Sequence, residues 1–359
     1  MFFLKGIGDA MRFYDILQCN PNAIKAMMKK SDNPKEIHKL RLGLATRAFL
    51  IVAFAILFIA PLTNLFGAEN SSMAVAVFCI LLGVRFVDFG YCIEDALLNL
   101  TIVFFLLLLS PVVAYYVPSL LGFLIHFISI FGILLITSDQ PEMGNGGLFS
   151  FAYIFLAGNP VSGTLLYQRF LMMLVGLLIC GSIFFVKHRH KHSDVKFSDK
   201  LATFTFESHK HRWQIRLALG VSLILFIGDV FDIEKFMWAG FACGSLLSDH
   251  LEDSKIHEKF IHRFVGVMIG CGLFYVLYTF LPISMHWLVG PLGGFCLGFC
   301  TEYKYKTALN CLGALMLVAG IYGLENTILL RMIHTLVGIV FALSFYQVFE
   351  FLTNRKKRV

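Results

Sequence analysis

The residues best suited to chemistry in this sequence are charged side chains at the edges of long apolar runs. Arg169 and Arg331 each begin such a run, and Gly176 and Gly338 follow them seven residues later. Seven residues are two turns of an α-helix, so each arginine shares a helix face with its glycine. A guanidinium presents a planar fork of N–H donors that matches a carboxylate. The two motifs therefore predict sites that attract organic anions.

The same spacing occurs a third time, between Arg263 and Gly270, with Gly266 one turn before the second glycine. Glycine lets a neighbouring helix approach closely, so we expect these two glycines, like Gly176 and Gly338, at helix contacts. An arginine on such a face points into protein or a wet cavity and can line a substrate pathway. The alternative is that the arginines extend to the membrane interface while the glycines only pack helices.

Two acids near the end of another apolar run form a second kind of candidate site. Asp229 and Asp232 stand where that run ends, and Lys235 follows them. Ionisable side chains at membrane depth are candidates for proton transfer. The alternative is a structural ion pair with Lys235. The sequence leaves both interpretations open.

Other groups of reactive side chains favour packing or solvation. Five histidines stand in residues 187–216, but the lysines and arginines of that segment would repel a metal cation. Cys296 and Cys300 are one helical turn apart, with no visible further metal ligands. The sequence contains no Gly-x-x-x-x-Gly-Lys-Ser/Thr loop for phosphate binding. We therefore expect no catalytic residue, no metal and no cofactor, and no enzymatic activity.

The composition places these residues in a membrane protein. The chain is 58% hydrophobic and only 15% charged, and its mean hydropathy is +0.76. These values are far too apolar for a soluble domain. The net charge of +7 is concentrated in the two ends and in residues 187–216. It therefore indicates orientation in a lipid bilayer rather than nucleic-acid binding.

The apolar sequence divides into twelve segments, six on either side of one polar run. A membrane helix needs about 20 apolar residues, so the chain has room for about twelve of them. The predicted organisation is a cytoplasmic segment at 1–45 with an amphipathic helix, a membrane half at 46–186, a basic linker at 187–214, a second membrane half at 215–352 and a basic tail at 353–359.

The basic linker and the basic ends predict the topology. Basic segments beside membrane helices stay in the cytoplasm, so each half needs an even number of crossings. We predict an all-α integral membrane protein with about twelve transmembrane helices, arranged as two parallel six-helix repeats. It would lie in the cell membrane with both termini cytoplasmic. Short or Gly- and Pro-interrupted segments near 147–156, 236–247 and 286–300 are typical of a transport pathway.

Several motifs of the second half carry a family resemblance. Residues 211–216 read HRWQIR, Trp238 precedes an alanine, and Arg263 opens the run RFVGVMIG. These motifs resemble the fusaric acid resistance, or aromatic acid exporter, superfamily. Val267 departs from the family signature, which usually has threonine there, and the short linker replaces the large cytoplasmic domain of many members. The resemblance implies a membrane transporter for organic anions and leaves a homodimer open.

The predicted function is gradient-driven or passive export of aromatic or other organic anions. The expected partners are a small organic anion and the lipid bilayer, without nucleic acid. The alternative is a membrane partner that supports an envelope assembly or resistance pathway without transporting anything. That alternative predicts that the arginines tolerate neutral replacement while the glycines do not.

Overall fold

The computed structural model describes residues 12–249 and 253–355. The structure is 83% helical, and no β-strand occurs within these ranges. The all-α membrane fold predicted from composition is therefore confirmed. The first eleven residues, which hold part of the predicted amphipathic helix, and most of the basic tail lie outside the described residues.

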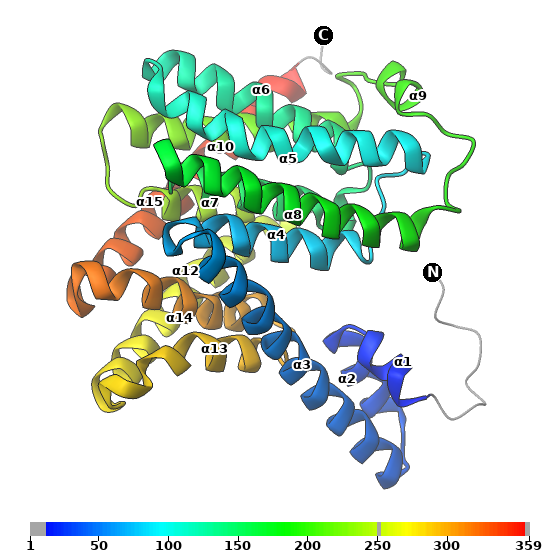
Figure 1. The fold of residues 1–359 in the computed structure, drawn as a ribbon, viewed down its shortest axis with the longest axis vertical. Helices are drawn as coiled ribbons and strands as arrows, with labels where there is room; N and C mark the ends of the chain where they lie inside the picture. The colour runs from blue at the N-terminus through cyan, green and yellow to red at the C-terminus, as the bar shows by residue number, and fades with distance from the viewer. Residues whose placement is uncertain (1–11, 250–252, 356–359) are drawn as a thin grey trace. The chain divides into compact units, whose positions relative to one another are not determined.

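The described chain is a succession of α-helices with three short 3-10 helices (Figure 1). In order they are α1 (Phe13–Gln18), α2 (Pro21–Lys30), α3 (Pro34–Phe66), η1 (Ala68–Asn70), α4 (Ser71–Val84), α5 (Ile93–Tyr116), α6 (Ser119–Thr137), η2 (Pro141–Met143), α7 (Asn145–Ala157), α8 (Gly163–His188), α9 (Phe197–Ala202), α10 (His209–Val230), α11 (Met237–Leu247), α12 (Asp253–Phe280), η3 (Ile283–Leu288), α13 (Val289–Leu297), α14 (Tyr303–Tyr322) and α15 (Leu324–Arg355).

Each apolar segment predicted from the sequence is helical, but the helices differ in length. Among the described residues, eight are long and apolar enough to cross a membrane, namely α3, α5, α6, α8, α10, α12, α14 and α15. The four shorter apolar stretches are Ala68–Val84, Asn145–Ala157, Met237–Leu247 and Ile283–Leu297. An 11-residue helix such as α11 rises about 16 Å, roughly half of the hydrocarbon core. About twelve crossings and the repeat arrangement therefore stay predictions.

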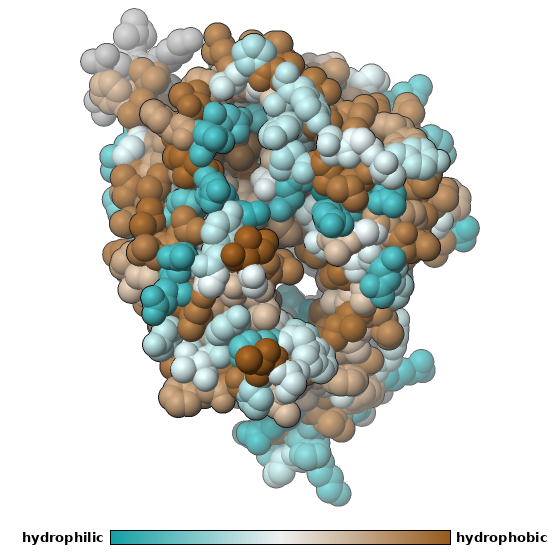
Figure 2. All heavy atoms as spheres, turned by 60° about the vertical axis from the view of Figure 1, so that its left-hand side comes forward, coloured by the Kyte–Doolittle hydropathy of each residue, from teal (hydrophilic) through white to brown (hydrophobic). Residues whose placement is uncertain are grey.

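Large apolar side chains lie on the outer surface as well as in the interior. Leu57, Leu178 and Phe280 are 73%, 70% and 80% exposed, respectively. Apolar residues also cover much of the face drawn in Figure 2. Soluble proteins rarely expose contiguous apolar surface of this kind. These side chains therefore fit contact with lipid.

The chain divides into two compact units. One comprises Met1–Ile56 and Val265–Leu329, and the other comprises Leu57–Phe264 and Leu330–Val359. In the first unit, α1 and α2 bury Ile16 and Ile24 against the start of α3, and Asn20 caps α2 by accepting a hydrogen bond from the Ala23 amide. In the second unit, α6 packs between α5 and α10, while α7 contacts α4 and α11.

The basic linker is docked onto the second unit. The Cys92 amide donates to the Val195 carbonyl oxygen, and the Phe197 amide donates to Asp95, both at 2.8 Å. Lys191 lies 2.9 Å from the Asp88 carboxylate, and His192 lies 3.1 Å from it. Lys200 of the linker also lies 2.8 Å from Asp139 in the α6–η2 loop. The linker, the α4–α5 loop and the α6–η2 loop therefore meet at one end of the helices.

Candidate functional site

Arg169 is almost completely buried, at 1% exposure, near the start of α8. Its Nε donates to the Asn70 side-chain oxygen at 2.9 Å, and its Nη1 donates to the Asn159 carbonyl oxygen at 2.9 Å. Its Nη2 donates to the Glu69 carbonyl oxygen and the Ser72 hydroxyl oxygen, at 3.3 and 3.2 Å. These four oxygens are uncharged. The guanidinium thus joins the ends of α4, α7 and α8, a geometry that favours a structural role.

Arg331 is also buried, at 4% exposure, but its setting is aromatic. Its guanidinium carbon lies 5.2 Å from the ring centre of Trp238 at the start of α11. One turn further along α15, Nδ1 of His334 lies 3.2 Å from the Lys235 carbonyl oxygen. This region of α15 is therefore fixed against the α10–α11 turn. Arg263 is buried as well, at 9% exposure, on α12.

The four predicted packing glycines all lie where a neighbouring helix approaches. A Cβ atom on Gly176 would stand 2.7 Å from the methyl carbons of Val77 on α4. On Gly266 and Gly270 it would stand 2.5 Å from carbonyl oxygens of α14. On Gly338 it would overlap Ala239 of α11. Each position therefore leaves no room for a side chain.

Asp229 is the exposed end of a polar chain, a short series of contacting polar side chains inside the helix bundle. Its Oδ2 lies 3.6 Å from Nε2 of His126, and its side chain is 49% exposed. Nδ1 of His126 lies 2.9 Å from the Tyr153 hydroxyl oxygen, and Tyr153 is hydrogen-bonded in turn to Ser129. His126, Ser129 and Tyr153 are all buried. The polar chain therefore runs from an exposed carboxylate on α10, through α6, to a buried phenol on α7.

Asp232 is not part of this polar chain. It is exposed in the turn after α10, where its φ of 47° lies in the left-handed region. Lys235 shares this backbone region with a φ of 54° and offers its carbonyl oxygen to His334. Among the described residues, no ion pair joins Lys235 to either acid. The structural alternative predicted for the two acids is therefore not observed.

The sequence interpretation missed His126 and Tyr153. The sequence did contain an indication of a functional His126, because it is the one ionisable side chain of the apolar run that forms α6. A single histidine in an apolar run is also compatible with ordinary packing, so the sequence alone could not assign it. Tyr153 is distant in sequence from both partners. In the part of the chain that the structure describes, no group of histidines, cysteines and acids could hold a metal ion.

The motif residues of the second half hold helix ends together. The Trp213 indole donates to the Ser248 carbonyl oxygen at 3.1 Å. The Gln214 amide donates to the carbonyl oxygens of Leu134 and Ser138, each at 3.1 Å. Arg216 pairs with Glu350 at 2.9 Å. The HRWQIR motif therefore connects the start of α10 to α6, α11 and α15.

Long apolar helices, an apolar outer surface and polar contacts at helix ends define an all-α, multi-pass membrane protein. Residues 223–345 match the family model described as fusaric acid resistance protein-like. The resemblance drawn from Trp238 and Arg263 is thereby confirmed over this part of the chain. No curated protein and no solved structure matches the chain.

Proposed function

We propose that this protein exports aromatic or other organic anions across the cell membrane, driven by a proton gradient. The observation that carries the proposal is the polar chain of Asp229, His126 and Tyr153 on α10, α6 and α7, of which α10 and α6 are long and apolar enough to cross a membrane. An unsatisfied buried polar group costs about 1–3 kcal/mol, so polar side chains inside an apolar bundle must pair with one another, as these do. Ionisable residues inside a membrane are by default candidates for transport or proton transfer.

The geometry supports a defined proton path. When His126 donates its Nδ1 hydrogen to the Tyr153 oxygen, the lone pair of Nε2 faces Asp229. A proton arriving at the exposed carboxylate then moves to Nε2. The imidazolium that forms is balanced by the Asp229 carboxylate, and Tyr153 is hydrogen-bonded to Ser129. We leave Asp232 out of this path because it lies in the exposed turn.

The predicted repeat and topology are part of the proposal. In the first half, α8 places Arg169 and Gly176 against α4, and in the second half α15 places Arg331 and Gly338 against α11. This correspondence supports parallel repeats. The linker docks on two loops that the topology also assigns to the cytoplasm, which supports an even number of crossings between them.

The arginines take different parts in this proposal. Because four oxygens already surround the guanidinium of Arg169, we assign that residue to fixing helix ends. Arg331 and Arg263 remain the proposed anion-attracting residues of the pathway. The proposal involves no enzymatic step, cofactor or nucleic acid, and it is compatible with a homodimer.

A second candidate function is a membrane partner that supports an envelope or resistance pathway without transport. The contacts of Trp213, Gln214 and Arg216 favour it, because these motif residues stabilise the bundle rather than line a pathway. The family match is compatible with either function.

Efflux from proteoliposomes tests the proposal. Vesicles loaded with a panel of aromatic carboxylates are compared with and without a proton gradient. We expect the gradient to accelerate efflux by the wild type and to have no effect on His126→Gln or Asp229→Asn. The matched control is Asp232→Asn, which makes the same charge change in the exposed turn and keeps a residue tolerant of positive φ.

Two results would contradict the proposal. Absence of efflux by the wild type across the panel would favour the non-transporting partner. Full gradient dependence in both polar-chain variants would exclude His126 and Asp229 from the proton path.

A further inference from the structure

Polar contacts join α6 to its neighbours at both of its ends. At one end lies the polar chain that begins at Asp229. At the other end, Gln214 of α10 donates to two carbonyl oxygens, each at 3.1 Å, and Asn145 of α7 donates to the Thr137 carbonyl oxygen at 2.7 Å. The same three helices therefore make both groups of contacts. His126 and Thr137 are about 16 Å apart along α6, on the rise of an α-helix.

Ser150 lies between these two groups of contacts on α7. It precedes Tyr153 by three residues, so the two side chains are neighbours on the helix surface. Ser150 is 2% exposed, and among the described residues its hydroxyl has no hydrogen-bond partner. A serine inside a helix can donate to a carbonyl oxygen one turn before it, as Ser222 does to Ala218 at 2.6 Å. The Ser150 hydroxyl is therefore left to a different partner inside the bundle.

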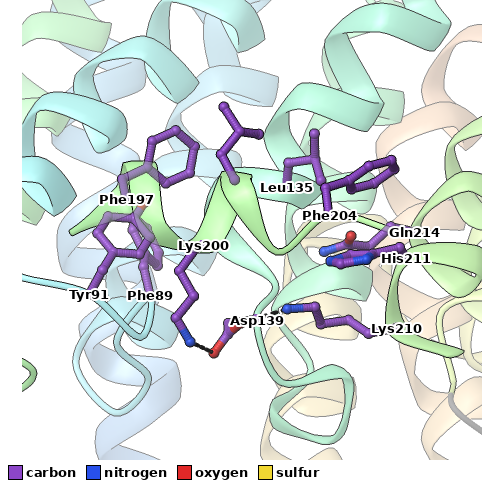
Figure 3. Close-up of a pocket in the computed structure, with 11 residues that line it drawn as sticks. Phe89, Tyr91, Leu135, Asp139, Phe197, Lys200, Phe204, Lys210, His211 and Gln214 are labelled. Atoms are coloured by element: carbon purple, nitrogen blue, oxygen red, sulfur yellow. Dashed lines mark hydrogen bonds and ion pairs between the residues drawn. The ribbon is translucent and has the colours of Figure 1, made fainter. Parts of the chain in front are cut away.

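Gln214 carries a second polar atom of this kind. Its Oε1 is buried and, in the part of the chain that the structure describes, accepts no hydrogen bond. The side chain borders a small hollow at the ends of α6 and α10, which Figure 3 shows beside Lys200 and Lys210. The hollow has a volume of about 20 Å³, whereas one water molecule needs about 10–15 Å³. The hollow therefore fits about one water molecule.

A second cavity shares a wall with this hollow, because Asp139 borders both. The second cavity has a volume of about 60 Å³, which is enough for several water molecules. Its lining is mostly polar and includes Asp88, Thr137, Asn145 and His192. Thr137 and Asn145 are the residues at which α6 ends and α7 begins. Water in this cavity therefore reaches the ends of two helices that also carry the polar chain.

Two lysines fix the carboxylate of Asp139 between the two cavities. Lys200 Nζ lies 2.8 Å from one oxygen and Lys210 Nζ lies 2.9 Å from the other, as the dashed lines in Figure 3 mark. Burial alone would raise the pKa of Asp139, but the hydrogen bonds and charges of the two lysines outweigh it and lower the pKa. Asp139 is therefore ionised at neutral pH. The remaining lone pairs of its oxygens can accept hydrogen bonds from water.

We propose that ordered water molecules bound by Ser150 and Gln214 extend the polar chain through the bundle, so that a proton entering at Asp229 leaves beside Asp139. Buried polar groups without a protein partner commonly bind ordered water, and such water is costly to remove. The inference rests on the proposed function, because it assigns the exit of the same proton path. Entry and exit then lie at opposite ends of α6, as transport across a membrane requires.

Each transfer along this path is balanced. The His126 imidazolium gives its Nδ1 proton to the Tyr153 oxygen, and Tyr153 releases its own hydrogen to Ser129. Ser129 in turn releases a hydrogen to the water at Ser150. The imidazole is left neutral with its hydrogen on Nε2, and a half-turn of the ring restores the starting tautomer. Each water molecule accepts one hydrogen and releases another, so one proton leaves for each that enters at Asp229.

Radiolytic footprinting of the purified full-length protein in detergent tests for this water without any gradient. X-rays convert bound water into hydroxyl radicals, which oxidise the nearest side chains, and mass spectrometry identifies the products. We expect oxidation of Tyr153, which is completely buried, and of Tyr91, which borders the hollow. Phe274 of α12 is as completely buried as Tyr153 and serves as the control that stays unlabelled.

Ser150→Ala removes the hydroxyl at the centre of the path. Loss of one hydrogen bond should lower the occupancy of the water about tenfold, and with it both the oxidation of Tyr153 and the gradient-dependent part of anion efflux. Ser222→Ala is the matched control, because that hydroxyl already has a partner in its own helix. It should leave both quantities unchanged. Thermal unfolding shows whether each variant is folded, and if Ser150→Ala is not, oxidation of Tyr153 in the wild type decides.

Gln214→Met tests the exit, because it keeps the length of the side chain and removes the acceptor. Oxidation of Tyr91 and the gradient-dependent part of efflux should both fall about tenfold. The amide of Gln214 also holds the end of α6, so thermal unfolding again shows whether the variant is folded. If it is not, oxidation of Tyr91 in the wild type decides.

The outcomes separate this exit from the proposed function. Oxidation of Tyr153 and Tyr91 no stronger than that of Phe274 in the wild type would overturn the inference. Full gradient dependence in a folded Ser150→Ala would also overturn it, because any water there would then be structural only. If His126→Gln abolishes gradient dependence and Ser150→Ala does not, the function is retained and the exit is rejected. Wild-type efflux that ignores the gradient would reject the proton path and its exit together.

Discussion

Arg169 shows how a buried positive charge is held by uncharged groups alone. The guanidinium directs its donors to a side-chain amide, a hydroxyl and two carbonyl oxygens at the ends of three helices. Carbonyl oxygens at such positions have no partner within their own helices. The arginine therefore satisfies groups that would otherwise remain unpaired. Its charge stabilises a junction between helices.

Replacing Arg169 by glutamine should destabilise the protein by about 3 kcal/mol, because several charge-assisted hydrogen bonds are lost in a buried site. Arg169→Lys should restore little of the lost stability, since a single ammonium group cannot reproduce the planar fork of donors of the guanidinium. Thermal and denaturant unfolding in detergent measure the effect. Arg189→Gln, at an exposed position of the linker, is the matched control.

One result would show that Arg169 belongs to the substrate pathway after all. That result is an unchanged free energy of unfolding together with loss of anion efflux per folded molecule. The structural assignment requires the opposite, namely reduced stability with normal efflux by the molecules that remain folded.

At the scale of helices, the spacing of residues in the sequence predicts where helices pack closely better than it predicts which polar side chains contact one another. Gly270 was identified from its place seven residues after Arg263, and it lies against the backbone of α14. The reason is physical, because helical periodicity fixes which residues share a face. Periodicity says nothing about which groups meet across a bundle. The contact of His126 with Asp229 and that of Asp139 with Lys200 and Lys210 therefore could not be predicted.

Two glycines of α12 provide a test of helix packing on one helix. Gly270→Ala should destabilise the protein by about 1–3 kcal/mol, because the new Cβ would stand 2.5 Å from the Ala308 carbonyl oxygen. Gly272 has no atom within 4 Å of the same position, so Gly272→Ala should stabilise the helix by about 0.4–1 kcal/mol. Unfolding in detergent measures both changes. Equal effects of the two substitutions would show that α14 does not approach Gly270 this closely.

At the scale of the whole molecule, hydropathy predicts the fold class and the helical segments. The sequence does not predict that the linker is docked, because its partners lie far away in the first half, Asp88 and Asp139 in loops and Asp95 in the first turn of α5. Nor does it predict the two compact units, each of which contains residues from both predicted halves.

The docked linker should be released in acid. Burial alone would raise the pKa of Asp88, but Lys191 and His192 outweigh it, and the pKa of Asp139 is lowered in the same manner. A lowered pKa means that docking is fully stabilised above the ordinary value of 3.8 and is lost as the pH falls below it. Pepsin digestion between pH 5 and 2 should therefore cut near Phe197 and Phe204 only at the acidic end.

The double variant Asp88→Asn/Asp139→Asn is the control for this experiment. It should be cut at pH 5 as readily as the wild type is cut in acid, because it lacks the two carboxylates at any pH. Resistance of the double variant, or equal cleavage of the wild type at all values, would show that other contacts hold the linker.

The packing of α6 against α10 also sets an order of assembly during synthesis. The ribosome completes α6 well before α10 emerges, and chains fold from the N-terminus as they are made. During that interval His126 lacks Asp229, and the carbonyl oxygen of Ser138 lacks the Gln214 amide. A polar face is therefore left without its partner helix in or beside the lipid. A nascent chain that stalls after the linker would present this face to membrane proteases and chaperones, whereas a finished chain conceals it.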